Sequence, residues 1–173
     1  MPGLQDPYFS GSLTYLCEHS SHGALGLIVN KPLELSFGDL IKQMGLQGNN
    51  LHTSIHPVYR GGPLHQDRGF VLHTGAPGWK SSLPVNDHLS LTTSVDILEA
   101  LAEGEGPADF LVALGCAGWE EGQLEQELLD NAWLTCPATT NILFTTPNDE
   151  RLHTAAASLG VNLNLMPGQA GHA

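Results

Sequence analysis

Three side chains that can bind a metal ion stand close together near the start of the chain: Cys17, His19 and His22. Thiolate and imidazole are both zinc ligands, and two of them on either side of a tight turn could chelate the ion. No second pair of ligands with matching spacing follows, however. Strand alternation also places Cys17 and His19 on the face that carries Leu13 and Tyr15. The pattern therefore favours a structural role, and we expect no metal site and no cofactor.

Two further cysteines are candidate nucleophiles. Cys116 follows the apolar run over 108–115 and precedes a predicted helix, so its thiol would lie at a helix N-terminus, where the dipole lowers the pKa of a thiol. Cys136 lies in a predicted loop, in the sequence Trp-Leu-Thr-Cys-Pro. Either thiol would need a base such as histidine nearby, and a free cysteine is often simply a buried apolar side chain. Cys136 and Cys116 are thus weak catalytic candidates, and on balance the sequence argues against an enzyme.

Polar residues at predicted strand ends and turns form another group: His22, Asn30, Arg68 and His73. Binding sites are often built at such positions. The Arg68 guanidinium has the fork that binds a carboxylate or phosphate, although it could equally pair with a neighbouring acid. Neither of the usual glycine-rich phosphate-binding motifs is present. We therefore take these four residues, together with Cys136, as candidates for lining a cleft that binds a small molecule.

The predicted helix over 120–130 carries five acidic residues and no basic one. Two tryptophans flank this helix, and aromatic residues beside charge are common at protein interfaces. The pattern is typical of a solvated face, but it also fits a magnesium site or a docking face for a basic partner. The residues that would form the docking face are Trp119, Glu120, Glu121, Glu125 and Trp133.

Net charge excludes some classes of partner. The 173 residues include 6 Lys and Arg against 18 Asp and Glu, which gives a formal charge of −12. A protein that grips nucleic acid or an anionic membrane surface needs a dominant basic face, and this chain cannot form one. No apolar stretch is long enough to span a membrane, and residues 1–10 lack the pattern of a signal peptide. With an odd number of cysteines, the sequence predicts a cytoplasmic protein with reduced thiols.

Apolar periodicity predicts an alternation of strands and helices. The first two strands, 12–19 and 24–29, form a hairpin, and residues 75–88 are irregular. Ser36 and Asp39 form a capping box at the start of a helix. Further strands are expected at 56–60, 69–73, 108–115, 141–144 and 161–166, and helices at 36–45, 95–104, 120–130 and 146–160. Hairpins precede strand–helix alternation, so the expected class is α+β with a mixed sheet.

Several motifs, in order along the chain, resemble the AlgH/YqgE family of small bacterial proteins. They are HGALGLIVNKP at 22–32, GGP at 61–63, DRGFVLH at 67–73, LGCAGW at 114–119, GQLE at 122–125, NAWL at 131–134 and AGHA at 170–173. The resemblance covers residues 1–173 as a single domain. Members usually have further residues before the first Met-Pro, including an apolar strand, so we expect this chain to lack that strand. Many members also have Tyr in place of Cys116.

The resemblance implies a compact α+β domain with a partly barrel-like mixed sheet and flanking helices. Members are mostly described as uncharacterised, and the AlgH name implies a regulator of transcription. With a charge of −12, such regulation would act through a protein partner rather than through direct contact with DNA. The alternative is a small-molecule-binding protein or thiol-dependent enzyme with a cleft formed by His22, Asn30, Arg68 and Cys136.

Overall fold

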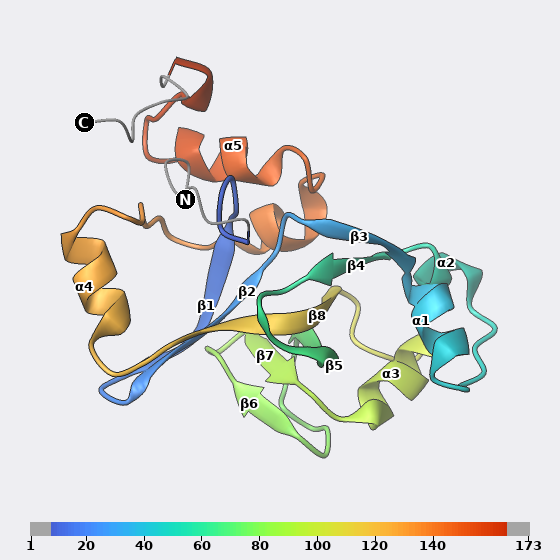
Figure 1. Ribbon diagram of the computed structural model, residues 1–173. Helices are drawn as coiled ribbons and strands as arrows, with labels where there is room; N and C mark the ends of the chain where they lie inside the picture. Colours follow the sequence, from blue (N-terminus) through green and yellow to red (C-terminus); the bar gives the residue numbers. More distant parts are fainter. Residues whose placement is uncertain (1–7, 166–173) are drawn as a thin grey trace.

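The computed structural model describes residues 8–165 (Figure 1). The expected lack of an N-terminal apolar strand and the AGHA motif at 170–173 both concern parts of the chain outside the described residues. The elements in chain order are β1 (Thr14–Ser20), β2 (Gly23–Ile28), β3 (Pro32–Ser36), α1 (Phe37–Gln43), α2 (Leu51–Ser54), β4 (Pro57–Arg60), β5 (Leu64–Thr74), β6 (Ser82–Pro84), β7 (Leu89–Thr92), α3 (Val95–Ala102), β8 (Phe110–Trp119), α4 (Gln123–Leu129), the π-helix η1 (Asn141–Thr145), α5 (Arg151–Ala157) and the 3₁₀ turn η2 (Leu163–Leu165).

One curled sheet organises these elements. Its strands follow the order β1-β2-β8-β5-β7-β6, and β4 pairs with both β8 and β3. The β4–β8 pair is parallel, with Val58 opposite Val112, and the other pairs are antiparallel. In Figure 1, α1 and α3 lie at one end of the sheet, whereas α4 and α5 lie toward the other end. The structure confirms the α+β class and a mixed, partly barrel-like sheet with flanking helices.

The central strand β8 supplies side chains to both faces of the sheet. Leu111 and Ala113 belong to a buried cluster with Leu27 and Leu72, while Val112 belongs to a second cluster around α1 and α3. This alternation is the period of two expected for a strand buried on both faces. A third cluster, around Trp119 and Leu124, lies under α4. The sheet is therefore covered on both sides, and β8 is the element that holds the clusters together.

Local sequence signals predicted several elements correctly. The β1–β2 hairpin is present, with Tyr15 and Cys17 buried. The Ser36 hydroxyl accepts a hydrogen bond from the Asp39 N–H, and the Asp39 carboxylate accepts one from the Ser36 N–H, which is the predicted capping box. Hydrogen bonding of the Asp39 carboxylate to Ser36, chiefly to its backbone N–H, lowers the pKa of Asp39. Helix α3 follows Ser94 as expected.

Other predictions were wrong. Residues 141–145 form the π-helix η1 rather than a strand, and the described part of 161–166 contains the turn η2. Strands β3, β6 and β7 were missed, and β6 lies in the segment expected to be irregular. Strand β8 continues to Trp119, beyond the predicted end at residue 115. Cys116 therefore lies inside a strand, and the expected placement of its thiol at a helix N-terminus is wrong.

Candidate functional site

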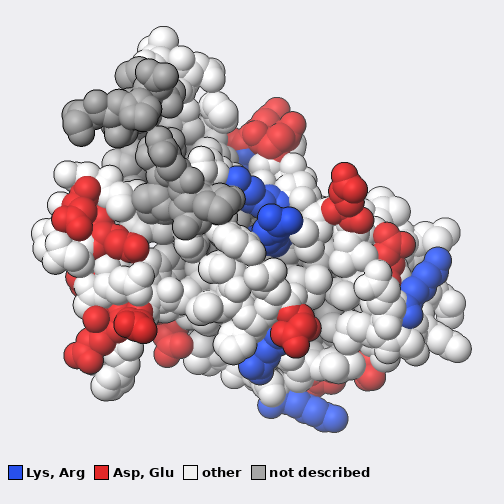
Figure 2. Space-filling model, viewed as in Figure 1, with Lys and Arg blue, Asp and Glu red and all other residues white. Residues whose placement is uncertain are grey.

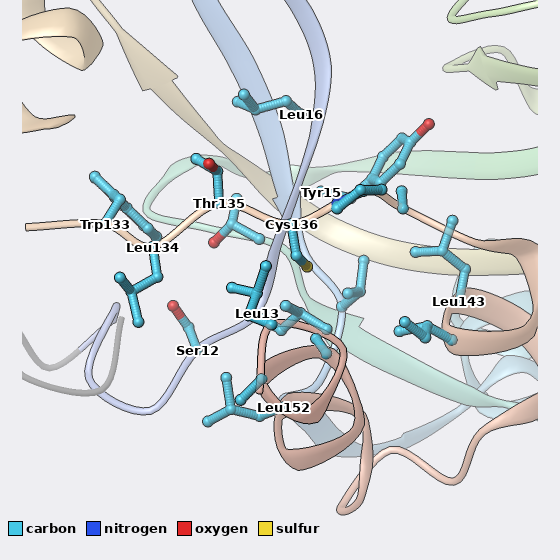
Figure 3. Close-up of a pocket in the computed structure, with 18 of the residues that line it drawn as sticks. Ser12, Leu13, Tyr15, Leu16, Trp133, Leu134, Thr135, Cys136, Leu143 and Leu152 are labelled. Atoms are coloured by element: carbon cyan, nitrogen blue, oxygen red, sulfur yellow. The ribbon is translucent and has the colours of Figure 1, made fainter. Parts of the chain in front are cut away.

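A pocket of about 340 Å³ lies between the edge strand β1 and the C-terminal part of the chain (Figure 3). Its walls come from residues 12–16, from α4, from the irregular segment 133–139, and from η1 and α5. Most of the lining side chains are aliphatic or aromatic, among them Leu13, Leu16, Leu128, Trp133, Leu143 and Leu152. No charged residue of the described chain is part of this lining, so the pocket is suited to an apolar molecule.

The position of β1 explains why a pocket forms here. Strand β1 lies at the end of the sheet and pairs only with β2. The segment 133–139 passes this edge without regular structure, and Pro137 within it has no N–H to donate to a ladder. The space between the strand edge and this segment is therefore closed by side chains rather than by a further strand.

Glu127 holds the outer wall of the pocket together. Its Oε2 atom accepts hydrogen bonds from the indole nitrogens of Trp119, at 2.6 Å, and Trp133, at 3.2 Å. The two indole rings are 5.6 Å apart at their centroids and nearly perpendicular, and Phe9 packs edge-on against Trp133. This arrangement fixes the beginning of the irregular segment against α4.

Several residues with polar side chains also belong to the pocket wall, among them Thr14, Tyr15 and Cys136. Cys136 is half-buried, and Figure 3 shows its side chain directed into the space that the labelled residues surround. The Thr14 hydroxyl oxygen is buried and has no hydrogen-bond partner among the described residues. A buried hydroxyl without a partner costs free energy, but this oxygen is enclosed by protein atoms and is not exposed to the pocket space. The phenol of Tyr15, which also lines the pocket, accepts a hydrogen bond of 3.5 Å from Asn86.

The other two thiols lie in the core. Cys17 is buried, and burial, followed by the nearby Cys116 and Glu18, raises its pKa to about 12. Burial also raises the pKa of Cys116, with a smaller opposing effect from Arg68. A thiol in this state is protonated at neutral pH and is a poor nucleophile. Cys116 therefore lacks the ionisation that a catalytic role requires.

The four polar candidates from the sequence do not line this pocket. His22 is exposed in the β1–β2 turn, and Arg68 is exposed and donates to the Thr93 hydroxyl at 3.3 Å. Asn30 accepts a hydrogen bond from the Leu13 N–H at 2.8 Å and donates to the Gly11 carbonyl at 3.0 Å. His73 is buried in the sheet beside Thr92, at 2.7 Å. Asn30 thus stabilises the approach to β1, and His73 belongs to the core.

The acidic helix has mixed roles. Trp119 is buried and Trp133 is half-buried, and both indoles face Glu127 rather than solvent. Glu125 is exposed and forms an ion pair of 2.6 Å with His19, and that hydrogen bond lowers the pKa of Glu125. Glu120 and Glu121 are exposed. Figure 2 shows acidic side chains gathered where Figure 1 places α4, with no lysine or arginine beside them on this face.

The described residues contain neither a metal-binding cluster nor a membrane-spanning helix. Between residues 8 and 165, no three His, Cys, Asp or Glu side chains are grouped so that they could hold a metal ion. No helix in this range is long and apolar enough to cross a membrane. The size and apolar lining of the pocket at β1 make it the leading candidate site.

Fold and pocket together define a class: an α+β domain with a curled mixed sheet and an apolar pocket at its first strand. The chain belongs to the AlgH-like family, whose model matches residues 1–164. A UPF0301 protein of Thioalkalivibrio sulfidiphilus is 54% identical over 173 residues, covering 100% of this chain and 92% of that protein. The UPF0301 protein YqgE of Escherichia coli is 51% identical over 177 residues, covering 100% of this chain and 95% of YqgE.

Two solved structures share the fold. The solution structure of AlgH from Pseudomonas aeruginosa superposes with a TM-score of 0.80 at 48% identity, covering 100% of this chain and 92% of that one. A crystal structure of a Corynebacterium diphtheriae protein, DIP2367, gives a TM-score of 0.66 at 19% identity, covering 87% of this chain and 78% of that one. At this low identity, the similarity to DIP2367 concerns the fold alone. These relatives confirm the family that the sequence motifs indicated.

Sequence reasoning missed most of the pocket. Only Cys136 and the two tryptophans of its lining were identified as candidates from the sequence, because most of the other lining residues are apolar and resemble ordinary core. The segment after α4 contains a run with no periodicity that includes Pro137. That run was the available signal, since an irregular segment beside a sheet edge leaves space that regular structure would fill.

Proposed function

We propose that this protein binds a small apolar molecule in the pocket between β1 and α5. The observation that carries the proposal is the pocket itself, about 340 Å³ with an apolar lining. That volume lies in the range of roughly 300–1,000 Å³ typical of small-molecule sites. Transfer of apolar surface from water contributes roughly 25 cal/mol per Å², so an apolar ligand would gain most of its affinity from this lining.

The polar groups near the pocket bear on whether it could be catalytic. Cys136 would lie against the bound molecule. No His, Asp or Glu of the described chain lines the pocket to act as a base for this thiol. The lining therefore supports reversible binding rather than thiol-dependent catalysis.

The test uses N-phenyl-1-naphthylamine, an uncharged dye whose fluorescence increases in apolar surroundings. We expect saturable enhancement with the full chain and with Cys136→Ser, which leaves the pocket open. Cys136→Phe should lose the enhancement, because the larger ring occupies the pocket. Thr140→Phe adds the same ring at an exposed position outside the lining and serves as the matched control. Equal dye binding by Cys136→Phe and the unsubstituted chain, or no binding by either, would contradict the proposal.

A second function is supported by a separate observation, the acidic surface over α4. We propose that the protein regulates transcription, the role that the AlgH name implies, and that it does so in the cytoplasm by binding a partner with a basic surface. The exposed Glu120, Glu121 and Glu125 would steer such a partner, and Leu129, which is 77% exposed, would add apolar contact. The free cysteines support a reducing compartment.

Salt titration against a labelled DNA duplex tests the indirect route. With a charge of −12, we expect no binding at physiological salt. A submicromolar Kd with a steep salt dependence would show direct contact with DNA and would overturn this second proposal. The dye experiment is unaffected by that outcome, so the two proposed functions can fail separately.

A further inference from the structure

Arg151, the first residue of α5, is the one arginine or lysine that is buried in the described chain. Its exposed fraction is 6%, whereas the other five basic side chains are exposed or half-exposed. A guanidinium group stays charged at any ordinary pH. Burial of a charge is unfavourable unless the charge is paired. The surroundings of Arg151 therefore need explanation.

Three contacts hold the guanidinium in place. Its Nε–H donates to the Thr146 carbonyl at 3.0 Å, and Nη1 donates to the Val29 carbonyl at 2.6 Å. The Tyr59 ring lies against the group, with its centroid 5.2 Å from Cζ, which is a cation–π contact. The group is thus fixed between α5, η1 and the end of β2. All three partners are neutral, however, and none of them balances the charge.

No carboxylate supplies the missing charge. Asp149 and Glu150 are close in sequence but exposed, and within residues 8–165 the one ion pair is that of His19 with Glu125. A guanidinium has five N–H donors. Two are used by the Thr146 and Val29 carbonyls, so three remain, and Nη2 has no hydrogen-bond partner in the described part of the chain. Arg151 therefore retains both unpaired charge and unused donors.

Arg151 lines a second pocket of about 280 Å³, which we name the Arg151 pocket. It lies where β4 and β8 begin and η1 ends, and it is separate from the apolar pocket, although Leu143 contributes to both. Other walls come from His56, Tyr59, Phe110, Phe144 and Asn148. The Tyr59 hydroxyl has no hydrogen-bond partner among the described residues and offers a second donor.

We infer that the Arg151 pocket binds a small organic oxyanion, a carboxylate or a phosphate monoester with an aromatic or aliphatic body. The free edge of a guanidinium presents two parallel N–H groups, a geometry that matches two oxygens of such an anion. The pocket is larger than a bare oxyanion, and its phenylalanine side chains would pack against an organic body. An anion bound here would pair a charge that the fold leaves buried and uncompensated.

The test follows the side-chain Nε–Hε signal of Arg151 by NMR in the full chain. The probes are benzoate, phenyl phosphate and inorganic phosphate, with uncharged benzyl alcohol as the control. We expect saturable shifts with benzoate or phenyl phosphate, a weaker response to inorganic phosphate, and none with benzyl alcohol. Whichever of benzoate and phenyl phosphate binds with the higher affinity shows whether the pocket prefers a carboxylate or a phosphate. If neither anion shifts the signal at millimolar concentration, or if benzyl alcohol shifts it equally, the inference fails.

A substituted chain separates binding from folding. Arg151→Met removes two hydrogen bonds to the backbone, so a loss of binding in it would not be distinguished from a loss of folding, and Asn148→Asp is the informative variant. It places a carboxylate on the wall of the Arg151 pocket, where it would pair with the guanidinium and compete with the ligand. We expect affinity to fall at least about tenfold and the melting temperature to rise. Asn162→Asp makes the same change of charge at a position outside the pocket. Equal anion affinity for the two variants would overturn the assignment.

Discussion

The Nε2 atom of His73 lies 2.7 Å from the Thr92 hydroxyl oxygen, deep in the sheet. The other ring nitrogen, Nδ1, is 3.0 Å from the Thr74 carbonyl oxygen, which can only accept, so Nδ1 carries a proton. In the neutral imidazole Nε2 then accepts from Thr92, whose oxygen can accept in turn from Ser82 at 2.7 Å. Burial lowers the pKa of His73, only partly offset by the hydrogen bond to Thr74, and thus favours this neutral form.

Stability should therefore fall on acidification. The pKa of His73 is about 6.5 in the unfolded chain and lower in the folded one. Below pH 6.5 the unfolded state therefore binds more protons than the folded state. The free energy of unfolding is expected to be steady above pH 6.5 and to decrease as the pH falls from 6.5 toward the folded pKa. His56, whose pKa is lowered by burial and by His52, contributes in the same direction. Thermal melts from pH 7.5 to 5.0 measure this.

His73→Gln is the comparison for that melt series. The variant has no titrating group at this position, so its stability should decline less steeply between pH 6.5 and 5 than that of the unsubstituted chain. An NMR titration of the His73 ring gives the folded pKa directly. A folded value at or above 6.5 would contradict the expected acid sensitivity.

Replacement of Gly61 by alanine is expected to destabilise the fold strongly. A Cβ at this position would lie 2.2 Å from the backbone oxygen of Gly115, which cannot move without disturbing β8. We expect Gly61→Ala to cost more than about 3 kcal/mol, which for a chain of this length is a decrease in Tm of roughly 6–12 °C. Differential scanning calorimetry measures the change.

Gly118→Ala is the matched control. Its added Cβ would lie 2.7 Å from Cδ1 of Leu64, the end of a flexible side chain that is 46% exposed and can turn away. We expect a cost of about 1 kcal/mol or less. Equal losses of Tm in the two variants would show that close approach of backbone at Gly61 is not the cause.

Elements that are determined by residues close together in the sequence could be predicted from it. The capping box needs only Ser36 and Asp39, three residues apart, and it begins α1 as expected. The run at 141–144 failed because a short apolar stretch fits a strand and a buried helix equally well. Packing of Ile142 and Leu143 against the core, rather than local preference, determined the π-helix.

The candidate sites depend on contacts between distant residues. Arg151 and the Val29 carbonyl are 122 positions apart, and no spacing rule connects them. The apolar pocket likewise combines β1 with residues from the last third of the chain. Motif reasoning identified polar side chains such as Asn30, which bonds to the backbone of Gly11 and Leu13 rather than lining the apolar pocket. Only the fold shows which apolar residues surround a space instead of filling it.

Glu127→Ala should loosen the outer wall of the apolar pocket. The substitution leaves the indole N–H groups of Trp119 and Trp133 without their common acceptor. We expect a loss of about 1–3 kcal/mol in the free energy of unfolding and a red shift of tryptophan emission as Trp133 becomes more exposed. Glu121→Ala removes an exposed acid of the same region and should change stability by less than about 0.5 kcal/mol. Unchanged emission in Glu127→Ala would contradict the role of Glu127.

Alkylation of the native protein should modify one cysteine of the three. Burial raises the pKa of Cys17 to about 12 and also raises that of Cys116, so both remain protonated and shielded at pH 7.5. Cys136 is half-buried at the wall of the apolar pocket, where iodoacetamide can reach it. Intact-mass spectrometry should thus show one adduct before unfolding and three in denaturant, and Cys136→Ser should show none before unfolding.

Saturation with N-phenyl-1-naphthylamine should slow the single reaction, because a bound apolar molecule would cover the thiol. Rapid modification of Cys17 or Cys116 in the native chain would contradict the buried placement of these thiols, and an unprotected Cys136 would place the dye elsewhere.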